Sequence, residues 1–184
     1  MVRILLTSFI LLVFSLNHVN AEKQKLLSPK EVVEKEMEYL SSDNTLAYTK
    51  LWVRAMQNEL LFLHSPRSKG KETIYNVDKA ELIEMKELPH AIASSYIPKL
   101  SRYISRFGHD GVKVLYIAAN YSVREENKYQ LNGPNYFLQV LVKEYGNWRI
   151  AESKIAPTDL ISAAGHGFGT KEEGEYAGKR KNIE

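Results

Sequence analysis

The sequence contains no cysteine. This absence excludes disulfide bonds, thiolate metal sites, a cysteine nucleophile and a lipid-modified cysteine at a signal-peptide cleavage site. Small exported eukaryotic domains often depend on disulfides, so a cysteine-free exported chain fits a bacterial protein with an adequate hydrophobic core. Hydrophobic residues make up 44% of the 184 residues, which is enough for such a core in one domain with a tail.

A large excess of charge of one sign is also missing. The formal net charge is +3, and it falls to +2 if the first 21 residues, which contain Arg3, are removed. Nucleic-acid-binding domains carry a clustered basic face. The basic cluster of this chain is the triplet 179–181, which we interpret as a solvated tail. We therefore expect no nucleic-acid partner.

Hydrophobic runs long enough to cross a bilayer are absent. The run at residues 4–16 has thirteen residues, fewer than the ~20 of a transmembrane helix. It follows Arg3 and precedes small residues ending at Ala21, which is the pattern of a secretory signal peptide. We expect cleavage after Ala21, no stable membrane span after cleavage, and a protein that is secreted or associated with the cell envelope. The alternative is an uncleaved anchor.

Recognisable metal, nucleotide and catalytic motifs are missing as well. The pair His109–Asp110 could orient an imidazole, but glycines on both sides indicate an exposed turn. The other histidines lie far apart, without metal-site spacing. The glycine-rich segment 165–171 has the spacing of neither nucleotide-binding loop. We predict no cofactor, no metal and no catalytic residue. The sequence favours a binding protein over an enzyme.

The N-terminal third carries helix signals. After a short charged leader at 22–27, Ser28 is followed by proline and, three residues on, by Glu31, which predicts a capped helix that ends near residue 41. A second helical segment is expected over 45–63, as one helix or as two shorter ones. A further short helix at 98–107 is an alternative to a loop.

The central and C-terminal parts carry strand signals. Strands are predicted at 80–88, 112–123, 136–145 and 148–155, the last two joined by a hairpin turn at Gly146–Asn147. The strand at 112–123 is apolar on both faces, so we expect it to be covered on both sides. These elements predict a single α+β domain over 28–157.

The remaining segment, 158–184, is predicted to be a short helix followed by a flexible polar tail. It contains five glycines after residue 164, and its sizeable apolar groups are Phe168, Tyr176 and Ile183. Ordering each residue costs about 1–2 kcal/mol of conformational entropy, which so few apolar groups would hardly offset.

Residues 136–144 and 146–150 form a hairpin that carries a tryptophan after its turn. This hairpin, and the order of helices and strands over 28–155, resemble the nuclear-transport-factor-2-like superfamily, nearest to exported or lipid-anchored members of Gram-positive bacteria. The resemblance implies N-terminal helices packed on a strongly bent antiparallel sheet, a cone-shaped domain with a cavity, and frequent homodimers. Members include isomerases, dehydratases and binding modules, so the fold alone assigns no function.

If the strands line such a cone, Tyr116, Asn120, Tyr136 and Gln139 offer polar groups to a ligand. No aspartate lies on the last three strands to act as a base. We therefore expect an exported, non-catalytic module that binds a small molecule or a cell-envelope protein. The alternative is an isomerase- or dehydratase-type enzyme, which a deep pocket with an inward carboxylate or histidine would favour.

Overall fold

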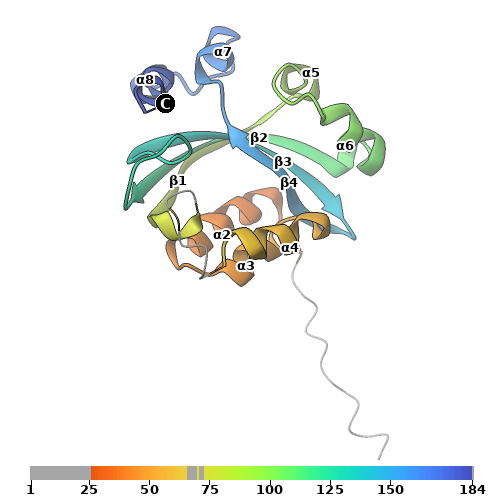
Figure 1. The fold of residues 1–184 in the computed structure, drawn as a ribbon. Helices are drawn as coiled ribbons and strands as arrows, with labels where there is room; N and C mark the ends of the chain where they lie inside the picture. Colours follow the sequence, from red (N-terminus) through yellow and green to blue (C-terminus); the bar gives the residue numbers. More distant parts are fainter. Residues whose placement is uncertain (1–25, 66–69, 71–72, 184) are drawn as a thin grey trace, which may run out of the picture.

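A four-stranded antiparallel sheet separates two groups of helices in the computed structural model of this chain, which describes residues 26–65, 70 and 73–183 (Figure 1). The strands lie side by side in chain order: β1 (Val77–Leu88), β2 (Val112–Val123), β3 (Gly133–Glu144) and β4 (Asn147–Ile155). The α+β class and the four strands expected from the sequence are confirmed. A strongly bent, cone-shaped sheet is not confirmed.

Helices α2 (Pro29–Ser41), α3 (Thr45–Lys50) and α4 (Arg54–Leu63) cover one face of the sheet, which we call the inner face (Figure 1). The capping box that the sequence predicts is present, with reciprocal hydrogen bonds of 2.8 and 3.2 Å between Ser28 and Glu31. The second helical segment is two helices because the chain between them bonds to β4: Val53 N–H donates to the Ile150 carbonyl at 2.9 Å.

The opposite, outer face carries the remaining helices (Figure 1). These are α5 (His90–Ala93), α6 (Leu100–Phe107), α7 (Thr158–Ala163) and α8 (Lys171–Lys181). Single 3-10 turns, η2 (Ile74–Asn76) and η3 (His109–Gly111), precede β1 and β2. Most of the segment predicted at 98–107 is thus helical, from Leu100 on, and His109–Asp110 lies in a turn as expected.

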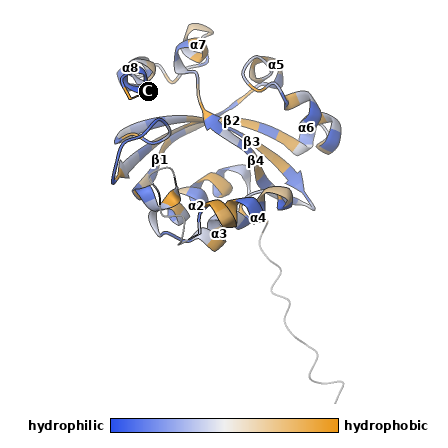
Figure 2. Ribbon diagram, viewed as in Figure 1, coloured by the Kyte–Doolittle hydropathy of each residue, from blue (hydrophilic) through white to orange (hydrophobic). Residues whose placement is uncertain are grey.

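Strand β2 is buried on both faces, as its sequence predicts. Leu115 and Ile117 belong to the cluster under the inner helices, whereas Val114 and Tyr116 belong to the cluster on the outer face. This division follows from the two-residue period of a strand. Figure 2 shows hydrophobic residues on the strands between the two helical groups. The sheet is therefore the middle layer of two separate cores.

The β3–β4 hairpin forms at the expected place, but its turn lies one residue earlier than predicted. Tyr145 and Gly146 have φ angles of 50° and 82°, and Glu144 pairs with Asn147 across the turn. Positive φ angles at both central residues are typical of the two-residue hairpin turn whose twist matches that of the strands. Tyr145 therefore adopts a left-handed conformation that only glycine adopts without strain. Trp148 follows the turn and packs, partly buried, against the inner core.

The segment after Gly165 is folded, which corrects the expectation of a flexible tail. Tyr176 of α8 is 1% exposed, and the Phe168 ring stacks on Tyr116 at 4.5 Å between centroids. Gly167 lets the chain before Phe168 pass close to α7, because a Cβ there would lie 2.3 Å from the Ser162 hydroxyl. The few apolar groups of the segment suffice because they enter an outer core already built by β2 and β3.

Glu173 adds a polar anchor to the same contact. Its carboxylate accepts hydrogen bonds from the Tyr116 hydroxyl at 2.5 Å and from the Gly169 N–H at 2.7 Å. Burial raises the pKa of Glu173, but these bonds, with others from Phe168 N–H and the Ser162 hydroxyl, outweigh it and lower the pKa below its ordinary value. The ionised carboxylate is therefore the form that holds α8 on the sheet.

Replacement by alanine should have opposite effects on stability at a turn glycine with positive φ, Gly146, and at a glycine within a helix, Gly174. Gly146→Ala should lower the free energy of unfolding by about 1–2 kcal/mol, because alanine is strained at a φ of 82°. Gly174→Ala, at an exposed site within α8 that has open space around it, should raise it by about 0.5–1 kcal/mol. Urea denaturation of both variants checks the pair. Equal effects would show that the turn geometry is wrong.

Truncation after Ala164 should destabilise the protein. It removes Phe168 and Tyr176 from the outer core and leaves Tyr116 uncovered, so we expect a loss of about 3 kcal/mol or more and a clearly lower melting temperature. The matched control deletes 182–184 alone, which are beyond α8 and should leave melting unchanged. Identical melting of the two truncated proteins would contradict the packing of α8 and restore the flexible tail.

Candidate functional site

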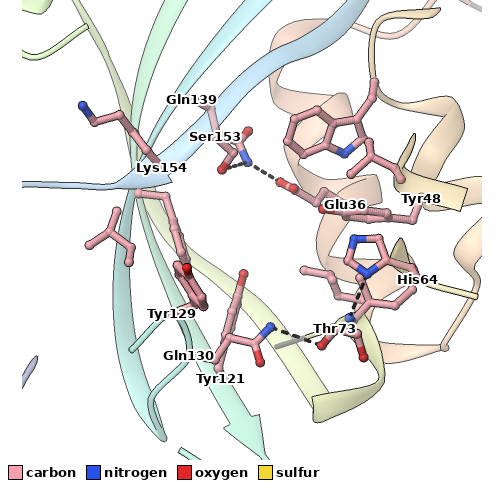
Figure 3. A pocket seen from close by; sticks show the side chains of 16 residues that line it. Glu36, Tyr48, His64, Thr73, Tyr121, Tyr129, Gln130, Gln139, Ser153 and Lys154 are labelled. Atoms are coloured by element: carbon pink, nitrogen blue, oxygen red, sulfur yellow. Dashed lines mark hydrogen bonds between the residues drawn. The ribbon is translucent and has the colours of Figure 1, made fainter. Parts of the chain in front are cut away.

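A pocket of about 540 Å³ lies between helices α2–α4 and the inner face of the sheet (Figure 3). Its volume is in the range of small-molecule sites. The helical side contributes Glu36, Tyr48 and Trp52, and β3 contributes Phe137 and Gln139. Aromatic and aliphatic side chains make up just over half of the lining, and the remaining side chains are polar: Glu36, His64, Thr73, Gln130, Gln139, Ser153 and Lys154.

Glu36 forms the polar centre of the pocket. It lies on the buried stripe of α2 and is 4% exposed. Gln139 Nε2 donates a hydrogen bond of 2.5 Å to Glu36 Oε2 and a longer one of 3.4 Å to Ser153 Oγ (Figure 3). Among the described residues, no lysine or arginine forms an ion pair with Glu36. The acid is therefore held by a neutral amide alone.

Burial governs the protonation of this acid. It raises the pKa of Glu36 to about 7, and the hydrogen bond from Gln139 opposes the rise only in part. Near neutral pH the carboxyl group is therefore divided between its neutral and ionised forms. Such a group exchanges a proton readily at physiological pH.

Gln139 also carries an unused acceptor. The residue is 2% exposed, and its Oε1 has no hydrogen-bond partner within the described part of the chain. A buried acceptor without a partner costs about 1–3 kcal/mol. Because Gln139 lines the pocket, a donor on an occupant could supply the missing bond.

Aromatic rings surround this polar centre. Tyr48 and Trp52 lie with ring centroids 6.1 Å apart, and Tyr121 and Phe137 lie 5.6 Å apart on the sheet side. Burial raises the pKa of both tyrosines, and the nearby Glu36 raises it further, so the phenols stay protonated. They are neutral groups with polar tips, suited to the flat face of a ligand.

His64 lies at the edge of the pocket, just after α4. Its ring makes an edge-to-face contact with Tyr48 at 5.6 Å, and its Nδ1 accepts a 3.4 Å hydrogen bond from the Ile74 N–H. Burial lowers the pKa of His64, so the imidazole is neutral at neutral pH. His64 thus brings no positive charge to Glu36.

The four residues proposed from the sequence do not form one site. Gln139 lines the inner pocket, whereas Tyr116 and Tyr136 lie on the outer face, where the C-terminal segment covers them. Asn120 is exposed near the end of β2. The strand period separates them, since Tyr136 and Gln139 are an odd number of residues apart and so face opposite sides. Tyr136 instead lines a smaller cavity of about 250 Å³ beside Phe168.

Sequence reasoning missed Glu36, the aromatic residues of α3 and the loop after it, and His64. One signal was present: Glu36 falls on the stripe of Val32, Val33, Met37 and Leu40, so a carboxylate interrupts the apolar face of an amphipathic helix. The others had no such signal because their positions depend on how the helices pack on the sheet.

Comparison with known proteins identifies no family. No family model matches the sequence, and no curated protein matches it. A solved structure that resembles the chain is that of a SEC-C motif containing protein from Rhodopseudomonas palustris, with a TM-score of 0.43 and 10% sequence identity over 70% of this chain and 79% of that one. The expected membership of the nuclear-transport-factor-2-like superfamily is wrong, since no model of that superfamily matches the chain.

No three metal-ligating side chains come together in the parts of the chain that the structure describes. None of the helices in those parts combines the length and hydrophobicity that crossing a bilayer requires. The predicted signal peptide at 1–21 and residues 22–25 of the leader predicted at 22–27 lie outside the described residues, so both stay predictions.

The raised pKa of Glu36 predicts a particular pH dependence of stability. Between about pH 4.5 and pH 7 the folded protein holds a proton that the unfolded chain has released, so stability falls as pH rises through this interval, by about 3 kcal/mol. Glu36→Gln removes this fall. Urea unfolding at pH 4.5, 6 and 7.5 should therefore show the variant gaining on the wild type as pH rises.

Glu34→Gln is the matched control for this measurement. Glu34 lies on the exposed face of the same helix, so its replacement should leave the pH dependence of the wild type almost unchanged. Parallel stability curves for the wild type and Glu36→Gln would show that Glu36 is solvated, and the pocket would lose its buried acid.

Proposed function

We propose that this chain is an exported binding module that holds a small, mostly apolar molecule in the pocket between α2–α4 and the sheet. The observation that carries the proposal is the buried Gln139 Oε1, which has no partner and lines an aromatic pocket beside Glu36. Export rests on the sequence of residues 1–21, with action outside the cell or at its envelope.

The energetics of the pocket support occupancy. The pocket of about 540 Å³ is open to solvent on one side, so its aromatic and aliphatic walls are apolar surface without packing contacts. Its lining also contains a polar pair that is only partly hydrogen-bonded. An apolar molecule with one donor group would supply both the missing contacts and the missing hydrogen bond.

A small-molecule enzyme of the isomerase or dehydratase type is the second candidate. The observation in its favour is Glu36, a pocket carboxyl group whose pKa of about 7 suits a general base at neutral pH. Both candidates require the pocket to bind a molecule. They differ in whether Glu36 then accepts a proton from it, so binding is the step to test first.

The two tryptophans of the chain allow a direct binding assay. Trp52 lines the pocket and Trp148 does not, so Trp148→Phe leaves one fluorophore at the site. A screen of small apolar molecules that carry one hydrogen-bond donor should find compounds that change Trp52 emission and raise the melting temperature. Affinity and stoichiometry then follow from calorimetry of the unaltered protein.

Two variants locate the binding. Ser153→Phe places a ring in the pocket and should abolish binding, whereas Asn120→Ala on the exposed outer face should leave it unchanged. Binding that survives Ser153→Phe but is lost in Asn120→Ala would move the site to the outer face. Conversion of a bound compound to product by the wild type, and not by Glu36→Gln, would establish the enzyme in place of the binding module.

A further inference from the structure

We propose that the natural occupant of the inner pocket is an organic cation, namely a primary or secondary ammonium group on an apolar or aromatic body. This inference rests on the proposed binding function and adds the chemical class of the ligand. The ammonium group would lie between Glu36 and Gln139 Oε1, and its body would lie against the aromatic walls.

The hydrogen-bonding groups at the polar centre are mainly acceptors. The Gln139 amide nitrogen is already engaged with Glu36 at 2.5 Å and with Ser153 at 3.4 Å. What remains at this centre for an occupant is the Glu36 carboxyl group and the unpartnered Gln139 Oε1. A donor without a partner among the described residues, the Trp52 Nε1–H, belongs to the aromatic wall of the pocket. An ammonium group brings two or three donors and no acceptor, so it complements this arrangement better than an alcohol and far better than a carboxylate.

The charges around Glu36 favour a cation as well. From α3 and β2, Tyr48 and Tyr121 present neutral phenols, and after α4 the half-buried His64 is neutral. From β4, Ser153 is uncharged, and the Lys154 ammonium donates to the Tyr96 carbonyl at 2.6 Å. Figure 3 shows Lys154 directed away from Glu36. Ionised Glu36 is therefore a negative charge without a positive partner, which is costly in a buried site.

The pocket walls suit the rest of such a ligand. Tyr48, Trp52, Tyr121 and Phe137 contribute four rings. Aromatic faces attract cations through their quadrupoles, most strongly when the cation has lost its water. A carboxylate beside several rings is thus a combination that stabilises an ammonium group and its apolar substituent together.

Binding should be linked to a proton. In the empty pocket the Glu36 carboxyl group has a pKa of about 7, and an adjacent ammonium group would lower it, so binding releases the proton that Glu36 holds. Affinity should therefore rise with pH, by about tenfold between pH 6 and pH 8, while the amine itself stays protonated.

The test compares three probes that share one body: 4-phenylbutylamine, 4-phenylbutan-1-ol and 4-phenylbutanoate. Calorimetry with the full protein at pH 7.5 should show the amine binding at least about tenfold more tightly than the alcohol, and the carboxylate not binding. Glu36→Gln should reduce amine affinity to that of the alcohol and abolish its pH dependence. Asn120→Ala should alter none of these values.

Each other outcome is decisive. Equal affinity of amine and alcohol, tighter binding of the carboxylate, or amine affinity that Glu36→Gln leaves intact would overturn the cation proposal while the pocket remains a binding site. No binding of the amine, when the fluorescence screen finds other occupants, would overturn it too. Failure of both the three probes and the screen would instead remove the binding function itself.

Discussion

Burial of β2 and β3 on both faces is the constraint from which the rest of the structure follows. Each strand must be covered twice, so the chain supplies α2–α4 before the sheet and α7–α8 after it. The two coverings differ in quality. On the outer face, Phe168 packs on Tyr116 and Tyr176 packs on Tyr136, which leaves a cavity of about 250 Å³, whereas the inner helices leave a pocket of about 540 Å³ around Glu36. The inner layer therefore contains the larger space.

Much of the layer structure could be predicted from local sequence. The capping box at Ser28, the double-sided pattern of 112–123 and the hairpin near Gly146 all express preferences of a few neighbouring residues, and the structure has each of them. The hairpin turn was placed one residue late because the sequence offers a Gly-Asn pair, whereas the strand register puts Tyr145 in the left-handed conformation.

The C-terminal segment and the pocket could not be predicted in the same way. The sequence of residues 165–184 looks too polar to fold alone, and the position of α8 depends on a sheet surface formed by distant residues and on the hydrogen bond from Tyr116 to Glu173. Likewise, Glu36 and Gln139 are 103 residues apart in the chain, and only the packing of α2 on β3 brings them within hydrogen-bond distance. Sequence patterns predict turns and the apolar faces of helices and strands, but they do not predict which of these faces pack against each other.

The pairing of Glu36 with Gln139 is difficult to explain as a stabilising feature of the fold. A leucine on the buried stripe of α2 would avoid the desolvation of an acid, and replacing buried polar pairs by hydrophobic residues is often neutral or stabilising. The pair also leaves one amide oxygen without a partner and one carboxyl group poised to ionise near pH 7. These costs are local to a space that a molecule could enter. An occupant that donates hydrogen bonds and carries positive charge would offset each of them, and so would give the polar pair in the inner core a physical reason to be there.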